Sequence, residues 1–418
     1  MALLFLCLIF GTGRAQKIEA AVQNVPESLE EESRLDTVGT DQETERAAVR
    51  EKKGQQEKEA GDTETDQAAA AQDELLAELD FDAIQQEVDS LLSSQQFSFA
   101  GTVRSLLQDG DPFRTFRAGN AVLSCAKTAF LAQKGLMKEL FLLVLAGAVL
   151  GSFSSLFEGK QVRDASFYMV YLLALALILK NFQSSGENLK AVITSLVAFM
   201  RILTPSYYLA AAAAGGASTA VMFYQTLLLV ILAVEKLLLA LVLPMIHIYL
   251  LIALVNDLSG EEILSHMTEL LETCVNGLLK SSLGVLVGMQ MIKNLIAPAL
   301  DSLRQMALWR TAGMIPGIGN AVNAVTELVA GSAVLIRNCF GVTAMLVLLA
   351  AGMVPAVQLL VSGLSFRLLA AAAQPVSDKR IAGCLAAAGK GYAMLLRLLL
   401  TVEVLFLLTI AILAGTFS

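Results

Sequence analysis

The sequence predicts an all-α, polytopic membrane protein with about eight transmembrane helices, a disordered acidic N-terminal tether and short amphipathic helices before the first span. Two observations predict this fold class. Of the 418 residues, 56% are apolar and 16% are charged, whereas soluble domains carry about 25% charged residues. The apolar residues are also gathered into runs of about 20, the length an α-helix needs to cross the hydrocarbon core of a bilayer. A lipid bilayer is therefore the expected environment.

Two segments precede the membrane domain in this prediction. Residues 1–15 are an apolar run ending in Gly13-Arg14-Ala15, which is typical of a signal peptide cleaved after Ala15. The alternative is an uncleaved anchor, although the run is short for a span. Within residues 16–76, the stretch 31–67 contains hardly any large apolar side chains, and residues 17–80 hold 19 acidic against 7 basic residues. Such a segment cannot bury enough surface to fold, so we expect a disordered tether.

Residues 77–138 are predicted to form an amphipathic helical region before the first span. Its first helix has an apolar stripe at the spacing of one helical face, made by Phe81, Ile84, Val88, Leu91 and Leu92. The motif "DGDP" at 109–112 is a turn signal. A second, partly basic helical stretch then leads into the transmembrane domain, residues 139–418.

Hydropathy divides residues 139–418 into about eight spans, because lipid leaves backbone polar groups no partner outside the segment itself. Six segments are separate: 139–157, 166–182, 277–298, 329–352, 354–374 and 392–414. The tract at 191–254 is long enough for two more spans, with an in-plane helix over 191–204.

The charge of the loops predicts their side of the membrane, since Lys and Arg are concentrated in cytoplasmic loops. The loop at 255–276 has five acidic residues and no Lys or Arg, so we expect it outside, together with both termini. The loops at 158–165, 299–328 and 375–391 carry Lys and Arg, so we expect them inside.

A Glu-Lys pair interrupts the apolar run "TLLLVILAVEKLLLALVLPMIHIYLLIAL" at 226–254. Leu237–Leu254 is long enough for one span, which places Glu235 and Lys236 at the membrane surface. The alternative buries both charges at mid-membrane, at roughly 2.5–3.5 kcal/mol each. Adjacent side chains point about 100° apart on a helix, so the two cannot pair face to face. We favour the surface position.

Three more polar residues lie within predicted spans. Arg337 in "GSAVLIRNCFGV" and Glu403 in "LLLTVEVLFLLTI" are ionisable residues of the kind that face a protein interior or a wet cavity and pair with one another. His247 is either functional or hydrogen-bonded to a neighbouring helix. Together with Glu235 and Lys236, these residues define a candidate intramembrane polar path. The alternative is that the four charged side chains reach the lipid headgroups by snorkelling.

No motif in the sequence indicates catalysis or binding of a metal or cofactor. The segment "GMIPGIGNAV" at 313–322 has Val322 where a dinucleotide-binding fingerprint needs Gly, and no phosphate-loop Lys follows. The 5 cysteines show no CxxC or metal-ligand spacing. Nucleic-acid binding has no support either, because no basic stripe with interleaved aromatics is present. We expect a non-enzymatic protein without cofactor or metal.

Five blocks occur in order along residues 78–418: "FSFAGTVRSLL", "LTPSYYLAAAAAGGASTAVMF", "LVNDLS", "MIPGIGNAVNAVTELVAGSAVLIRNCFGV" and "QPVSDKRIAGCLAAAGKGYAMLL". These blocks, with the hydropathy profile around them, resemble the stage III sporulation protein AE family of endospore-forming bacteria. No catalytic residue is established for that family, so the resemblance implies none here.

The resemblance implies a membrane subunit of the channel-like or secretion-like complex between mother cell and forespore, required for endospore development and acting as conduit or scaffold. It also implies a multi-pass protein in the mother-cell-derived, outer forespore membrane. Its implied partners are other stage III A sporulation membrane proteins and a forespore membrane partner. The alternative function is a stand-alone secondary transporter that moves an unknown solute past Arg337 and Glu403. Such transporters often contain inverted repeats, and no clear repeat is visible in this sequence.

Overall fold

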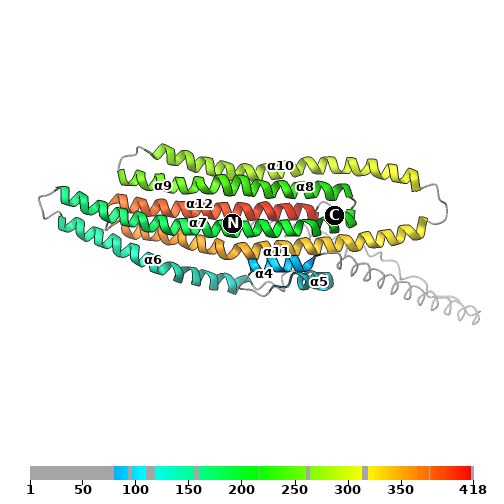
Figure 1. Ribbon diagram of the computed structural model, residues 1–418, viewed down its shortest axis with the longest axis horizontal. Helices are drawn as coiled ribbons and strands as arrows, with labels where there is room; N and C mark the ends of the chain where they lie inside the picture. The colour runs from blue at the N-terminus through cyan, green and yellow to red at the C-terminus, as the bar shows by residue number, and fades with distance from the viewer. Residues whose placement is uncertain are drawn as a thin grey trace, which may run out of the picture. The chain divides into compact units, whose positions relative to one another are not determined.

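The computed structural model describes residues 80–92, 97–109, 118–154, 160–215, 217–259, 264–312, 319–375 and 377–415. All regular structure in these ranges is helical (Figure 1), which confirms the predicted all-α class. The segments predicted as signal peptide and tether lie outside the described residues. The helices are α4 Phe81–Leu91, α5 Phe99–Asp109, α6 Ala118–Ser154, α7 Lys160–Gly215, α8 Ala217–Ala233, η1 Val234–Val242, α9 Leu243–Ser259, α10 Ser265–Ala312, α11 Gly319–Ala373 and α12 Lys379–Gly415.

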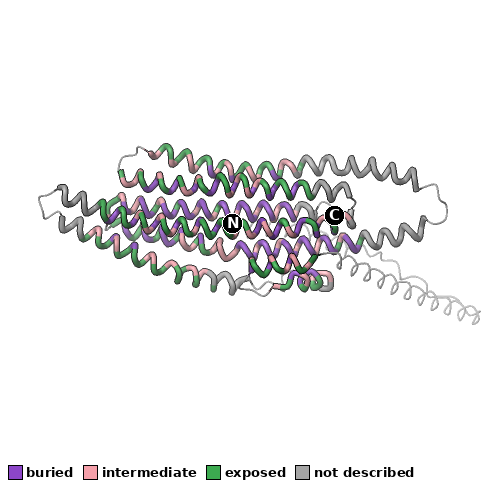
Figure 2. The backbone as a smooth tube through the Cα atoms, viewed as in Figure 1, coloured by how far each residue is buried: buried purple, intermediate pink, exposed green. Residues whose placement is uncertain are grey.

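The long helices lie side by side and alternate in direction along the chain, with α8, η1 and α9 forming one continuous rod (Figure 1). α12 occupies the inner position, because it packs against α11, α9, α7 and α10. Figure 2 shows buried residues along α12 and mostly exposed or half-buried residues along α10. The most apolar window of α12 is 61% buried and that of α10 only 17%. α10 is therefore the most loosely held of the candidate spans.

The two short helices before α6 dock onto the bundle, where α4 packs against α7 and α5 packs against α11. Asp80 caps the first turn of α4 by accepting a hydrogen bond from the Ala83 amide at 3.1 Å, and Ile84, Val88 and Leu92 of the predicted stripe are buried. Gln85 ties α4 to α5, because its Oε1 accepts from the Phe99 amide at 2.8 Å.

An aromatic triad completes this docking: the rings of Phe81 and Phe99 both contact Phe340 of α11, with centroids 6.1 and 5.0 Å from it. The amphipathic helices therefore bury their apolar face against the bundle.

The predicted number of spans is wrong. Five helical segments in the described residues are long and apolar enough to cross a membrane, namely Tyr168–Ala210, Tyr224–Ser259, Ser265–Met289, Gly331–Ala373 and Lys379–Ala411. The error arises because windows of about 20 residues divide long continuous helices. The predicted spans 329–352 and 354–374 are one helix, α11, that continues through Pro355. The predicted span 166–182 and in-plane helix 191–204 are both parts of α7.

The predicted first span, 139–157, is not among the five. It begins in the second half of α6, and residues 155–157 lie outside the described residues. α6 packs against α11 and α7 and exposes Phe141, Leu142 and Leu145.

Several candidate spans are longer than a bilayer is thick. Tyr168–Ala210 and Gly331–Ala373 contain 43 residues each, which corresponds to about 65 Å of helix at about 1.5 Å per residue. The hydrocarbon core of a bilayer is about 30 Å thick. α7 and α11 must therefore project beyond the hydrocarbon region while remaining helical.

Two turns lie at the same end of the bundle, one in the loop 255–276 and one in the loop 375–391. The charges of these loops predict the two turns on opposite sides of the membrane. The guanidinium of Arg380 donates to the Leu258 carbonyl at 3.5 Å, and a Cβ built at Gly383 would meet the Asp257 carboxylate at 3.1 Å. The start of α12 therefore contacts the end of α9. The prediction failed because it counted three spans between these turns, whereas the described chain has two, Ser265–Met289 and Gly331–Ala373.

This arrangement predicts the labelling of two turns. With the native cysteines replaced, a cysteine at Ser265 and a cysteine at Ser377 should both react with an impermeant maleimide from the same side of sealed vesicles, because an even number of spans separates them. The measurement compares right-side-out with inverted vesicles. Labelling of the two positions from opposite sides would restore the odd number of spans derived from hydropathy.

Candidate functional site

Glu235 and Lys236 lie inside a π-helical segment, η1, within a single candidate span. Glu235 pairs with Arg201 of α7, with Nη2 and Oε1 2.7 Å apart and the two side chains 55% and 31% exposed. Lys236 is exposed. π-helical segments are often found at functional sites, and from this segment Glu235 reaches α7. The partner Arg201 was missed because it was assigned to an in-plane helix.

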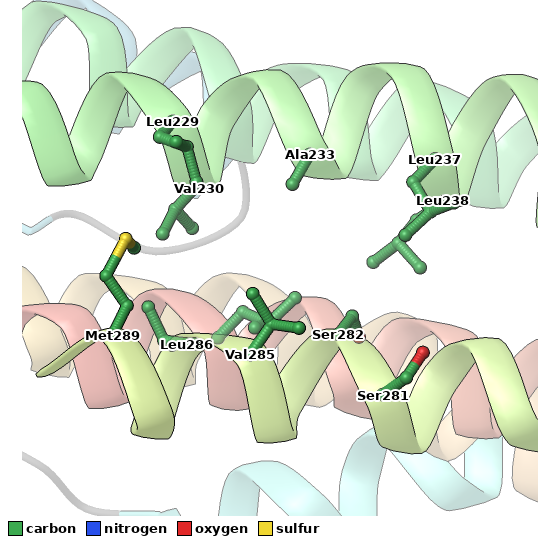
Figure 3. Close-up of a pocket in the computed structure, with 11 residues that line it drawn as sticks. Leu229, Val230, Ala233, Leu237, Leu238, Ser281, Ser282, Val285, Leu286 and Met289 are labelled. Atoms are coloured by element: carbon green, nitrogen blue, oxygen red, sulfur yellow. The ribbon is translucent and has the colours of Figure 1, made fainter. Parts of the chain in front are cut away.

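An apolar cavity of about 130 Å³ separates α8 and η1 from α10 (Figure 3). Ala233 and Leu238 line one side, and Val285, Leu286 and Met289 of α10 line the other. Ser281 and Ser282 of α10 also line the cavity, and their hydroxyls donate to carbonyls of their own helix. Empty cavities of this apolar kind stay dry, so this space provides no polar route for a solute.

His247 packs against α7. Its Nδ1 lies 2.9 Å from the Leu243 carbonyl of its own helix, and because a carbonyl only accepts, Nδ1 carries the proton. The other edge of the ring faces Gly186, where a Cβ would lie 2.5 Å from Nε2. The ring of Phe182 makes an edge contact with the imidazole, with centroids 5.3 Å apart. The histidine is thus hydrogen-bonded within α9 and held closely against α7.

A partly buried hydrogen-bond network joins α7 to α12 beside this histidine. The Asn181 amide donates to the Tyr392 hydroxyl at 2.6 Å, and the Ser185 hydroxyl lies 3.2 Å from the same oxygen. Phe366 of α11 stacks on the Tyr392 ring at 5.2 Å. This cluster connects α7, α11 and α12 at one level, and sequence reasoning did not single out its polar members.

Glu403 lies at the interface of α12 and α11, and only 7% of it is exposed. Its carboxylate rests on the bare backbone of Gly352, so that a Cβ at residue 352 would coincide with Oε1. Within the described residues, Oε1 has no hydrogen-bond partner. Burying a polar group without a partner is costly. An exception of this kind calls for a role or an unseen partner, which makes Glu403 the strongest candidate among the predicted residues.

Arg337 is 1% exposed on α11 and lies near the docked amphipathic helices. Its Nη2 donates to the Asn338 side chain at 3.3 Å. Tyr207 of α7 lies alongside, its ring 6.0 Å from that of Phe340 and its hydroxyl 3.4 Å from the Cβ position of Gly341. The fully buried position rules out snorkelling within this single chain.

The hypothesised pair between Arg337 and Glu403 is not formed. Glu403 contacts α11 at Gly352, which is 15 residues from Arg337 and therefore about 22 Å away along the helix. A glutamate side chain cannot span that distance.

The five predicted residues do not form one cluster either, because His247, Arg337 and Glu403 occupy separate levels of the bundle. Buried apolar side chains lie between these levels on α12, for example Leu395, Leu399 and Val402 between Tyr392 and Glu403. A polar path through them stays a prediction.

A second polar group, absent from the predicted residues, lies where α9 meets α12. Tyr171 of α7 donates to the Leu254 carbonyl at 2.6 Å, and Asp257 and Arg380 make the contacts described above. Asp257 and Arg380 come from the blocks "LVNDLS" and "QPVSDKRIAGC". The charges in those blocks were a usable signal, but only the tertiary structure shows that the two blocks meet.

Comparisons with known proteins agree with the sequence blocks. A family model described as stage III sporulation protein AE matches residues 97–416. A protein of Bacillus subtilis (strain 168) named stage III sporulation protein AE is 22% identical over 291 residues, which cover 69% of this chain and 73% of that protein. No solved structure matches the chain. The family match includes every candidate span.

The contact between Gly352 and Glu403 predicts a strained variant. In Gly352→Ala the new methyl group would occupy the place of the carboxylate, and overpacking of this kind typically costs about 1–3 kcal/mol. We expect a lower unfolding temperature in detergent, measured by circular dichroism. The added change Glu403→Ala should recover part of the loss, since it removes the clashing group.

Gly277→Ala is the matched control, because nothing lies within 4 Å of a Cβ at that position. If Gly352→Ala and Gly277→Ala are equally stable, Glu403 does not rest on Gly352.

The cavity beside η1 predicts a stabilising variant. In Ala233→Leu the larger side chain would project into the space between α8 and α10 (Figure 3), and filling a cavity commonly stabilises by about 0.5–2 kcal/mol. We expect a higher unfolding temperature in detergent. Ala240→Leu, on an exposed position of η1, should leave the temperature nearly unchanged. A loss of stability in Ala233→Leu would show that the helices close this space.

Proposed function

The chain belongs to the stage III sporulation protein AE family, and we propose that it is a non-enzymatic membrane subunit of the channel-like or secretion-like complex between mother cell and forespore. In this proposal it acts in the mother-cell-derived, outer forespore membrane during endospore development. Its partners are other stage III A sporulation membrane proteins and a membrane protein of the forespore. The family supports the role in sporulation, and the five apolar helical segments support a multi-pass position in a membrane.

The outward face of α10 is the observation that carries the subunit role. Gly277, Gly284 and Gly288 lie on this face, and a Cβ at any of them would meet nothing within 4 Å. Ser281, at the edge of this face beside the cavity of Figure 3, is also exposed. Small residues on a transmembrane helix allow another helix to approach closely, which is how helices associate in lipid. A loosely held span with this face is typical of a subunit that packs against other membrane helices.

The interior of the bundle favours two roles, a scaffold or a conduit that forms between several subunits. It does not favour a conduit that runs through a single chain. In the described part of the chain the polar groups occupy separate levels, with buried apolar side chains between them. The cavity beside η1 is apolar as well. A pathway for cargo would then be lined by faces of several subunits, with this chain providing α10 as a contact.

A stand-alone secondary transporter is the alternative. Broken helices at mid-membrane would favour it, because their ends bind substrate and coupling ions. α7 and α11 remain continuous through Pro205 and Pro355, so this feature is not present in either helix. The buried carboxylate of Glu403 is the observation in favour of transport.

The deciding experiment is purification of the full chain from sporulating cells, followed by identification of the co-purifying proteins. We expect a stable complex with other sporulation membrane proteins. Gly284→Leu should lose these partners, because a bulky side chain blocks close approach of a helix, and its own unfolding temperature should be unchanged.

Ala176→Leu, on an exposed position of α7, is the control and should retain the complex. Solute flux by the purified chain alone in liposomes, with no partners recovered from cells, would instead establish the transporter.

A further inference from the structure

A groove of about 470 Å³ runs between α10 and α12. It is distinct from the cavity in Figure 3, which lies between α10 and α8 with η1. One part of the groove is basic, with Lys280 of α10 and Arg397 of α12, and no acidic residue lines it. Both helices are candidate membrane spans, so the groove lies beside membrane-embedded helices.

Neither cation of the groove is neutralised by a carboxylate within the described residues. Arg397 donates from Nη1 to the side-chain carbonyl of Asn276 at 2.9 Å. Asn276 is uncharged, so this bond orients the guanidinium and leaves its charge and its other donors available. Lys280 is exposed and forms no ion pair in the part of the chain that the structure describes.

The chemistry of the two cations indicates an anionic oxygen ligand. A cation beside the apolar part of a span is costly unless it reaches the headgroups or pairs with an anion. The planar guanidinium matches the oxygens of a phosphate in a two-bond geometry, and the lysine ammonium adds a flexible point charge. Asn276 holds the arginine in place, so less conformational freedom is lost when the anion binds.

The rest of the groove is apolar and forms a track. Leu279 and Leu283 are four residues apart on α10, and Leu400 and Val404 are four residues apart on α12, so each pair lies along one helical face. The remaining hydroxyl, that of Thr401, donates to the carbonyl of Arg397 at 2.8 Å. The hydroxyl is therefore already satisfied and does not make the track polar.

We propose that this groove binds an anionic phospholipid. The phosphate lies on Arg397 and Lys280, and an acyl chain follows the track between α10 and α12. Basic pockets between transmembrane helices bind anionic headgroups in this way. A free phosphate would leave the apolar track unused, and an acidic protein segment would place its backbone polar groups against leucines. The bound lipid would also fill the space that leaves α10 loosely held.

The test measures binding of phosphatidylglycerol to the full purified chain in detergent, by native mass spectrometry. We expect bound phosphatidylglycerol and little phosphatidylcholine. Arg397→Gln and Lys280→Gln should each weaken phosphatidylglycerol binding about tenfold, the effect expected for loss of a hydrogen bond to a charged group. Lys180→Gln, which removes an exposed cation of α7 away from the groove, should bind like the original chain.

Leu283→Trp tests the apolar lining of the groove independently of the charges, because it narrows the groove while both cations remain. It should weaken phosphatidylglycerol binding even though the charges are unchanged. Equal binding of the two lipids, or unchanged lipid binding in Lys280→Gln, would overturn the proposal. Displacement of the lipid by millimolar inorganic phosphate would show a site for a free anion and overturn it too. Because Lys280 is exposed, Lys280→Gln should fold, and it tests the proposal even if Arg397→Gln fails to fold.

Discussion

Close approach of helices at glycines is the constraint on which the rest of the structure depends. Lipid offers no partner to backbone polar groups, so the chain must be helical, and it offers no hydrophobic drive for helices to associate. α11, α12 and α7 approach one another where a glycine of one helix receives a large side chain of another. The pairs are Gly352 with Glu403, Gly363 with Tyr392, Gly389 with Arg367, and Gly391 with Phe182. These contacts determine the register of α12, and with it the level of every polar group it carries.

This register explains why the interior is a series of separate polar groups. Tyr392 meets Asn181 and Ser185 at one level, and Glu403 meets Gly352 about 16 Å further along α12, at about 1.5 Å per residue. The helices α7, α11 and α12 form the most closely packed part of the described bundle. α10 lies at the edge, with a groove on one flank and a cavity on the other. Contacts with other proteins and with lipid are therefore expected at α10.

The candidate site was predictable only in part, and the reasons are physical. The burial of Arg337 and Glu403 could be inferred because each is a lone charge in a long apolar segment. The distance between these two residues could not be inferred, since it depends on how far α12 is shifted along α11. The partner of Glu235 was missed because Arg201 is 34 residues away in sequence and was assigned to an in-plane helix. Asp257 and Arg380 were read only as loop charges.

The sequence by itself determined the helical class, the apolar character of the helices, the family and the presence of charges within them. The helical class, the apolar character and the presence of charges depend on local composition and periodicity, because in lipid each helix must satisfy its own backbone. The family follows from the five sequence blocks. Only the tertiary structure decided how many spans these helices form, which turns share one end of the bundle and which charges meet. A hydropathy window cannot distinguish one helix continuing through Pro355 from two helices separated by a turn. The difference depends on packing against α12, whose residues lie far away in the sequence.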